Sequence, residues 1–387
     1  MSTAPKGFRF ATACAGFRKE GRADLALLVS DVPAVAAGTF TQNRFPAAPV
    51  LVAKAMLAER PAARAVVINS GQANACTGDE GMRNCRTTQE LVAGALGLEA
   101  SDILPASTGV IGAQLKMDLW EKAAPALAAN LGKATPEDFA KAIMTTDAFH
   151  KISHREVSLP GGVVKLVGMA KGAGMICPNM ATMLVFITTD CAISPAMLQK
   201  ALSTDIANTF NMVSVDGDTS TNDMVTVLAN GLAGNAEITE EGADFTAFMQ
   251  ALNTVTVYLC RCIAGDGEGA TKLLECKVSG AETLDIAKTV AKSVICSSLT
   301  KAAMFGADAN WGRVLCAIGY SGAPVDVNKI DVQFASKAGT ILVCENGAGV
   351  DFSEEQAKKI LLEHEIEILI DLKSGSAAST AWGCDLT

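Results

Sequence analysis

The chain has 387 residues, of which 49% are hydrophobic and only 5% aromatic, so alanine and aliphatic side chains must fill its core. This length allows about two or three compact domains, and the composition is that of an α/β enzyme, not of a fibrous or disordered protein. A formal net charge of −9, with no lysine- or arginine-rich run, argues against general nucleic-acid binding.

The spacing of apolar residues predicts helices and strands that alternate along the whole chain. In chain order we expect a strand at 63–69, helices at 79–96, 115–131 and 136–144, strands at 163–168 and 183–188, helices at 195–210, 244–263 and 281–293, strands at 329–334 and 340–343, a helix at 354–363 and a strand at 366–372. Thr135 is the expected N-cap of the third helix. Helices that can cover sheet faces throughout predict a layered α/β sandwich.

The sequence carries no evident membrane span or secretory signal. The longest uncharged stretch, at 172–189, contains Pro178 and Asn179 and is expected to be a loop followed by a strand. The N-terminal residues MSTAPKGFRF lack the apolar core of a signal peptide. Twelve cysteines are scattered without a CxxC pair, which indicates reduced, buried thiols and a cytoplasmic protein.

Histidine is scarce, and this limits the chemistry that the chain can use. The only histidines are His150, His154 and His364, which lie in polar surroundings and are expected to be solvated. The two in HKISH are four residues apart, but the β-like run after them argues against a helix, and no nearby carboxylate completes a zinc site. We therefore expect no metal, and a hydrolase or transferase would have to work without histidine.

Two glycine-rich segments are candidates for binding. The run GDGEG at 265–269 lacks the spacing of a nucleotide-binding loop, so a tight turn is the better interpretation, although Glu268 within it could bind an ammonium group. The run MAKGAGMICPNMATML at 169–184 contains Gly172 and Gly174, which permit unusual backbone conformations. By itself this second run predicts a loop before a buried strand.

The second run resembles the self-cleavage site of the ornithine acetyltransferases, also called glutamate N-acetyltransferases, whose pattern KGxGMIxPxMATML it matches throughout. The resemblance extends over nearly the whole chain. The other matching segments are NSGQANACTG at 69–78, STGVIG at 107–112, MTTD at 144–147, SVDGDTSTND at 214–223, RCIAGDGEGA at 261–270, FGADANWGR at 305–313 and AWGCD at 381–385.

This resemblance implies that the precursor breaks between Ala181 and Thr182. The products would be an α chain of residues 1–181 and a β chain of residues 182–387, with a smaller C-terminal α+β domain at about 280–387. The implied fold is the layered α-β-β-α sandwich of the self-cleaving ornithine acetyltransferase and aminopeptidase type. Cleavage would leave Thr182 with both a hydroxyl nucleophile and a free α-amine, whose reference pKa of about 8 lets it accept the hydroxyl proton.

The implied activity is ping-pong transfer of an acetyl group from N-acetylornithine to glutamate, in arginine biosynthesis, through an acetyl-Thr182 intermediate. Thr108 and Gly109 would stabilise the oxyanion, and the catalytic set would need no cofactor. The resemblance assigns substrate binding to Thr145, Lys171, Thr182 and Glu268, with Thr146 as an alternative to Thr145. It also implies that the two chains associate, two of each, and it leaves open whether acetyl-CoA is a second donor.

The family pattern continues past AWGCD with a short tail that supplies further substrate contacts, whereas the present sequence ends at Thr387. Substrate affinity and selectivity are therefore less secure expectations than the cleavage chemistry. Two other functions remain open at this stage. One is an amidase or aminopeptidase on the same fold, with water as the acceptor. The other is a self-cleaved but inactive binding protein.

Overall fold

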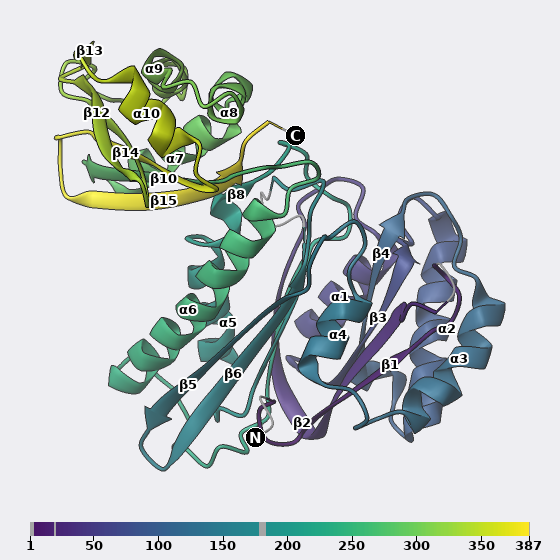
Figure 1. The fold of residues 1–387 in the computed structure, drawn as a ribbon. Coiled ribbons are helices and arrows are strands. Elements are labelled where there is room, and N and C mark those ends of the chain that lie inside the picture. The colour runs from purple at the N-terminus through teal and green to yellow at the C-terminus, as the bar shows by residue number, and fades with distance from the viewer. Residues whose placement is uncertain (1–3, 19–20, 178–182, 387) are drawn as a thin grey trace. The chain divides into compact units, whose positions relative to one another are not determined.

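The computed structural model describes residues 4–18, 21–177 and 183–386. It divides into two compact units, each built from segments that are not contiguous in the sequence. The first unit comprises Met1–Gly172, Asn179–Ala207 and Thr219–Leu259, and the second comprises Ala173–Pro178, Asn208–Asp218 and Cys260–Thr387. Figure 1 shows the chain coloured from the N-terminus to the C-terminus.

The first unit is organised around one large sheet. Along the sheet the strands of the described residues follow the order β4-β3-β2-β9-β7-β6-β5, and β1 pairs separately with β2. These strands are β1 (Phe8–Ala13), β2 (Leu25–Phe40), β3 (Ala62–Gln72), β4 (Ile103–Val110), β5 (Lys151–Leu159), β6 (Gly162–Lys171), β7 (Leu184–Thr189) and β9 (Met224–Ala229). The first half of the long strand β2 pairs with β1 and β3, and its second half pairs with β9, so β2 joins the two parts of the sheet.

Side chains on the two faces of β3 belong to different cores, as the alternation of a strand requires. Val66 and Ile68 join an inner core with residues of β6, β7 and β9, whereas Ala65 and Val67 face an outer core with α2 (Gly78–Leu96) and α3 (Met117–Ala129). The inner core also takes residues from α1 (Ala48–Glu59) and α4 (Pro136–Ala142).

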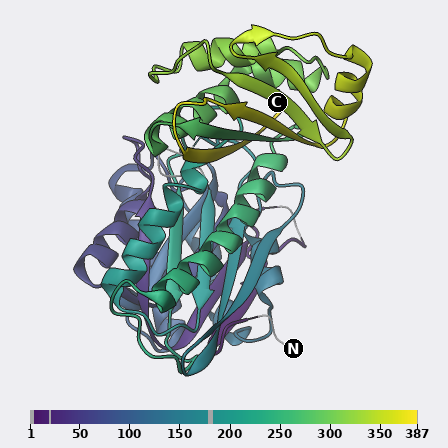
Figure 2. The ribbon, with the colours of Figure 1, turned by 90° about the vertical axis from the view of Figure 1, so that its left-hand side faces the viewer.

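The outer face of β6 is covered by α6 (Ala243–Gly265), which approaches closely at Gly168. A Cβ atom at Gly168 would lie 2.6 Å from the Val255 side chain and 2.9 Å from that of Leu259. Figures 1 and 2 show α6 beside α5 (Pro195–Ile206) on this face. The strands β1–β4 form one β layer, and β5, β6, β7 and β9 form the other, with β2 joining the two. Together with α2/α3 on one outer face and α5/α6 on the other, they confirm the predicted α-β-β-α sandwich, with α1 and α4 added to its inner core.

The second unit contains the other sheet, whose described strands follow the order β13-β12-β11-β14-β10-β15-β8. Helix α7 (Leu284–Cys296) packs on β10 and β15, and α10 (Glu354–Leu361) packs on β11 and β12. The remaining helices are α8 (Ser298–Phe305) and α9 (Trp311–Gly319). The strands are β8 (Val213–Ser214), β10 (Leu273–Ala281), β11 (Asp331–Ser336), β12 (Gly339–Glu345), β13 (Ala348–Gly349), β14 (Glu365–Asp371) and β15 (Ala377–Cys384).

Most expected elements are present with ends shifted by a few residues. Thr135 caps α4 as predicted, because its hydroxyl accepts from the Asp138 amide and the Asp138 side chain bonds back to the Thr135 amide. The segment with His154 is strand β5, as its β-like pattern indicated. The helix expected at 195–210 ends earlier, at Ile206.

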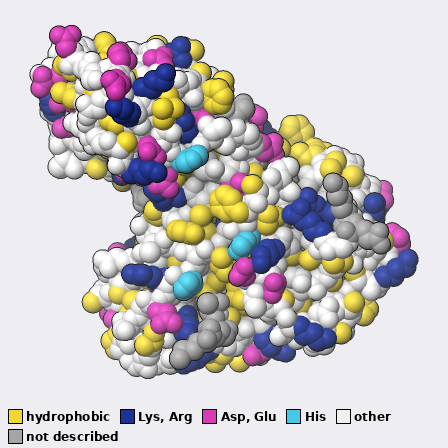
Figure 3. Space-filling model, in the orientation of Figure 1, with side chains coloured by type: hydrophobic (Ala, Val, Ile, Leu, Met, Phe, Trp, Pro, Cys, Tyr) yellow, Lys and Arg dark blue, Asp and Glu magenta, His cyan; other side chains and the backbone are white. Residues whose placement is uncertain are grey.

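None of the helices in the described ranges is long and apolar enough to cross a membrane. On the face in Figure 3, lysine and arginine side chains are interspersed with acidic ones.

Candidate functional site

Thr108 and Gly109 lie at the end of β4, where its parallel pairing with β3 becomes irregular. The register is regular up to Gly71 opposite Gly109 and then shifts at Gln72. Gly109 has a φ of +133°, and a Cβ atom there would lie 2.2 Å from the carbonyl carbon of Gly71. Only glycine fits this close approach. The next residue, Val110, is 64% exposed, so the strand end reaches the surface.

Buried amide and hydroxyl side chains hold this strand end in place. The Ser107 hydroxyl donates to Asn69 Oδ1 at 2.6 Å, and Asn69 Nδ2 donates to the Gln72 carbonyl at 2.8 Å. Asn222 Nδ2 donates to the carbonyls of Ala73 and Ser107, at 2.6 and 2.8 Å. Three of the motifs that carry the family resemblance therefore meet beneath Thr108, and these asparagines have a structural role that the sequence did not reveal.

Lys171, at the end of β6, lies next to Thr108. Its ammonium donates to Thr108 Oγ1 at 3.3 Å, and both side chains are buried. Burial lowers the pKa of Lys171, because the charged form loses water, while the carboxylate of Asp147 favours the charged form and opposes that shift. Two predicted site residues from strands far apart in the sequence are thus in direct contact.

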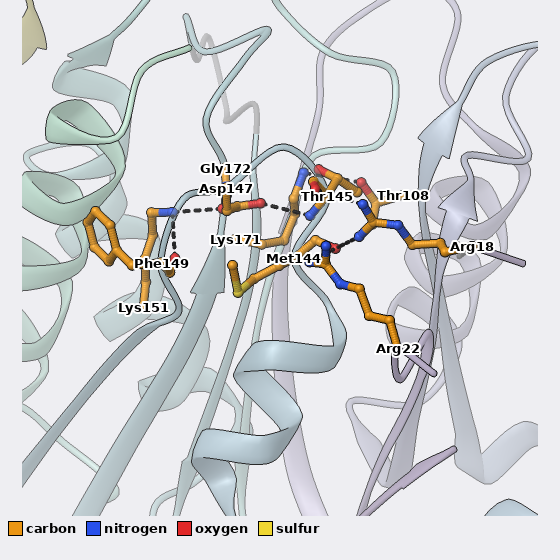
Figure 4. A network of polar contacts seen from close by, with 10 residues as sticks. All are labelled: Arg18, Arg22, Thr108, Met144, Thr145, Asp147, Phe149, Lys151, Lys171 and Gly172. Atoms are coloured by element: carbon orange, nitrogen blue, oxygen red, sulfur yellow. Dashed lines mark hydrogen bonds and ion pairs between the residues drawn. The ribbon is translucent and has the colours of Figure 1, made fainter. Parts of the chain in front are cut away.

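Asp147 is the centre of a polar network that sequence reasoning missed (Figure 4). Its Oδ1 accepts from Lys151 Nζ and from the Gly172 amide, both at 2.7 Å, and its Oδ2 accepts from the Thr145 amide at 2.9 Å. Burial by itself would raise the pKa of Asp147, but the ammonium groups of Lys171 and Lys151 and these hydrogen bonds outweigh it and lower the pKa to about 2. The carboxylate is therefore ionised at neutral pH.

Thr145 is half-buried, and both of its backbone polar groups are already bonded. Its amide donates to Asp147, and its carbonyl accepts from Arg18 Nη2 at 2.8 Å. The Met144 carbonyl also accepts from Arg18. These contacts fix the backbone of Thr145, whereas its neighbour Thr146 is exposed. Arg18 is a further residue of this region, and no sequence motif pointed to it.

The predicted cleavage residues Ala181 and Thr182 lie outside the described residues. The first described residues after them are Met183, which is buried, and Leu184, which begins β7. Leu184 is the register partner of Lys171. The strand that follows Thr182 in the sequence therefore begins opposite the residue that contacts Thr108.

Glu268 belongs to the second unit and lies in the turn that follows α6. The Glu268 amide donates to the Ala173 carbonyl at 3.1 Å, and a Cβ atom at Gly174 would lie 2.7 Å from Glu268 Oε1. Gly174 thus permits the carboxylate to approach the glycine-rich run. The turn follows a helix and not a strand, which supports the interpretation of GDGEG as a tight turn.

Asp216, also in the second unit, binds the same glycine-rich run. Its carboxylate accepts from the amides of Met175 and Ile176, at 2.6 and 2.9 Å, and the Val215 amide donates to the Ile176 carbonyl. Met175 has a φ of +54°, which is unusual for a residue with a side chain. Strained backbone of this kind is often found near functional sites. No cluster of three His, Cys, Asp or Glu side chains that could hold a metal ion occurs among the residues described.

Comparisons with known proteins agree with the resemblance over the whole chain. The ArgJ family matches residues 9–387. Arginine biosynthesis bifunctional protein ArgJ of Nitratidesulfovibrio vulgaris is 53% identical, with 100% of this chain and 97% of the relative covered. The protein of the same name from Thermotoga neapolitana is 48% identical, with 99% and 96% covered.

One solved structure supports the same assignment. The crystal structure of arginine biosynthesis bifunctional protein argJ from Bacillus halodurans is 46% identical and superposes with a TM-score of 0.50. That match covers 53% of this chain and 93% of the solved chain. On the full-length family match and these relatives, the chain belongs to the ArgJ family.

Proposed function

We propose that this chain is a self-cleaving acetyltransferase of arginine biosynthesis that transfers the acetyl group of N-acetylornithine to glutamate through an acetyl ester on Thr182. The observation that carries the proposal is the contact between Lys171 and Thr108 at the point where β7, the strand after Thr182, begins. Its support from known proteins is membership of the ArgJ family, whose relatives are named for arginine biosynthesis.

Self-cleavage would be an intramolecular acyl shift. The Thr182 hydroxyl attacks the Ala181 carbonyl carbon, the peptide C–N bond breaks, and the chain is joined by an ester. The hydroxyl proton passes to the departing Thr182 nitrogen, which becomes the free α-amine. Water then opens the ester, so that Ala181 gains a carboxylate and Thr182 regains its hydroxyl. The fragments of residues 1–181 and 182–387 would stay associated, and we propose an assembly with two copies of each in the cytoplasm.

Acetyl transfer would use the same hydroxyl twice. The α-amine of Thr182 takes the hydroxyl proton as the oxygen attacks the acetyl carbonyl, and the proton then passes to the departing ornithine amine. The glutamate amine next attacks the acetyl ester and releases Thr182. The negative oxygen in each step would be stabilised by the Thr108 hydroxyl and the Gly109 amide, and losing one such donor costs about 10²–10³ in rate.

Substrate ends would be held by charged side chains of complementary sign. Lys171 would contact a substrate carboxylate, Glu268 would contact the ornithine side-chain amine, and Thr145 would contribute its hydroxyl. The structure favours Thr145 over Thr146 only in that the backbone of Thr145 is fixed by Asp147 and Arg18. A second donor, acetyl-CoA, would add the first acetylation step of the pathway to the same site.

Two measurements on the purified protein test this proposal. Intact mass should show chains of 181 and 206 residues (387 − 181 = 206), whereas Thr182→Ala should remain one chain without activity. With N-acetylornithine and glutamate the cleaved protein should form ornithine and N-acetylglutamate, and without glutamate it should stop at an acetylated 206-residue chain. Acetate release at an undiminished rate without glutamate would instead identify an amidase. Replacing N-acetylornithine by acetyl-CoA decides whether there is a second donor.

A further inference from the structure

The Lys171 ammonium determines how the Thr108 hydroxyl can be used. An ammonium group has three donors and no acceptor, so in the 3.3 Å contact Thr108 Oγ1 must accept. The hydroxyl hydrogen then has to point away from Lys171. A hydroxyl without such a neighbour rotates freely, and it donates in the required direction for only part of the time.

Ionised partners also make a hydrogen bond stronger. A donor bonded to a charged group is polarised, and charge-assisted hydrogen bonds are roughly twice as strong as neutral ones. The Thr108 hydroxyl, which accepts from an ammonium group, is therefore a better donor towards a third atom. The adjacent Gly109 already presents its backbone at the surface end of β4. The two donors proposed for the oxyanion thus differ, because the Thr108 hydroxyl accepts a hydrogen bond from a charged group, whereas a backbone amide such as that of Gly109 cannot accept one.

Asp147 keeps the ammonium in this position. It accepts the amide of Gly172, the residue directly after Lys171, at 2.7 Å, and its negative charge favours the charged form of Lys171. Asp223 acts in the same sense, whereas burial, the largest influence, lowers the pKa of Lys171, and the charges of Lys151 and Arg18 add to that lowering. Further hydrogen bonds of Asp147 and Lys151, with the Thr145 amide, with each other and with the Phe149 carbonyl, belong to the same network shown in Figure 4.

We propose that Lys171 is a positioning residue for the oxyanion site: it orients and polarises the Thr108 hydroxyl, in addition to any contact with substrate, and Asp147 holds it there. This inference rests on the proposed function and assigns Lys171 a role that a carboxylate ligand alone would not have. The two roles have different kinetic signatures. Orienting an oxyanion donor acts on the transition state and lowers kcat, whereas holding a substrate carboxylate acts mainly on KM.

A double-mutant cycle separates the two roles. Lys171→Met should lower kcat by about tenfold to a hundredfold, which corresponds to one charge-assisted hydrogen bond. Thr108→Val, which removes the hydroxyl at nearly constant volume, should lower kcat by about 10²–10³. In the Thr108→Val background, Lys171→Met should change kcat by less than about twofold, because the group on which it acts is gone. Thr108→Ser keeps the hydroxyl and should restore the dependence on Lys171.

Lys165→Met is the matched control. Lys165 is on the same strand β6, and its ammonium pairs with Glu156 at 3.0 Å, away from Thr108. Its replacement should leave kcat and its dependence on Thr108 unchanged. Intact mass gives the cleaved fraction of each variant, and each kcat is calculated per mole of cleaved protein.

Two results would overturn the inference. If the fold-losses of kcat in Lys171→Met and Thr108→Val multiply in the double variant, Lys171 does not act through Thr108. A rise in KM with kcat intact in Lys171→Met would make Lys171 a substrate ligand only. Either result leaves the proposed function standing, whereas a cleaved wild-type protein without acetyl transfer would refute the proposed function and this inference together.

Discussion

Replacement of Asp147 by asparagine should destabilise the protein strongly, because it leaves a buried ammonium group without its counter-ion. The side chains of Asp147 and Lys151 are both 0% exposed, with 2.7 Å between Lys151 Nζ and Asp147 Oδ1. The carboxylate also accepts the amides of Thr145 and Gly172. Asparagine has one acceptor oxygen in place of two and carries no charge, so it cannot serve all of these donors.

The structure allows the magnitude to be worked out in two ways. The pKa of Asp147 lies at about 2 against an ordinary value of 3.8, and 3.8 − 2 ≈ 1.8 pKa units correspond to about 2 kcal/mol of folding free energy. Removing one partner of a buried ion pair costs about 3–5 kcal/mol, because the other charge remains buried. The larger figure applies to Asp147→Asn, since protonation of the wild-type carboxyl leaves the side chain and its geometry in place.

Urea denaturation at pH 7 measures this loss of unfolding free energy. The double variant Asp147→Asn/Lys151→Met should recover part of it, because the Lys151 charge is removed together with the carboxylate that it pairs with, whereas the nearby Lys171 remains. Glu355→Gln is a matched control: Glu355 pairs with Lys359 at the same spacing of four residues and the same 2.7 Å, but the two side chains are 82% and 68% exposed. It should show no measurable change. The reasoning would be refuted if Asp147→Asn lowered the free energy of unfolding by less than about 1 kcal/mol, or if the double variant recovered none of the loss.

The lowered pKa of Asp147 also determines how the free energy of unfolding changes at acid pH. A carboxyl whose pKa is lowered on folding adds stability above its unfolded pKa of 3.8, and this contribution is lost as the pH falls from there towards 2. Asp147→Asn should therefore lose less stability than the wild type over that interval. Urea denaturation curves of both proteins, recorded above and below this pH interval, give the two losses of unfolding free energy to be compared.

Three further outcomes are expected. Gly109→Ala should fold poorly or lose activity by at least tenfold, since its Cβ would lie 2.2 Å from Gly71 and its φ is +133°; normal soluble yield and kcat would contradict the close approach. Glu268→Gln should raise KM for N-acetylornithine more than it lowers kcat, and a loss of kcat at saturation would make Glu268 a proton-transfer residue. Double-reciprocal plots should be parallel, whereas intersecting lines would favour direct transfer in a ternary complex.

The sequence predicted local elements better than their assembly. The run of β-forming residues at 63–69 located β3, and helical spacing after the Thr135 cap located α4, because both signals depend on neighbouring residues. Strand β2 went unpredicted, since its alanine-rich sequence favours neither period and its strand character comes from pairing with β3 and β9. Ala173–Pro178 joins the second unit through contacts with residues 40 or more positions away, which no local pattern encodes.

In the candidate site, too, individual residues could be predicted from the sequence, whereas their contacts in space could not. Thr108, Gly109 and Lys171 came from a family resemblance, and the spatial contact between Lys171 and Thr108 could not be deduced from their separation of 63 residues. Asp147 lay within the quoted motif MTTD without an assigned role. A buried aspartate four residues before a lysine was the available signal, but burial itself is decided by tertiary packing.

The strand order of the first unit bears on the fate of the two fragments that the proposed cleavage at 181–182 would produce. Strands β7 and β9, from the second fragment, are inserted between β2 and β6 of the first. In the second unit, residues of the first fragment before Pro178 bond to Asp216 and Glu268 of the second. The fragment of residues 1–181 therefore lacks two strands of its sheet, and the fragment of residues 182–387 carries β7 and β9 without their neighbours, although the described strands of the other sheet all belong to it. Each fragment should be a client for chaperones or proteases when synthesised alone. Coexpression from two separate genes should rescue both, as one interlocked heterodimer.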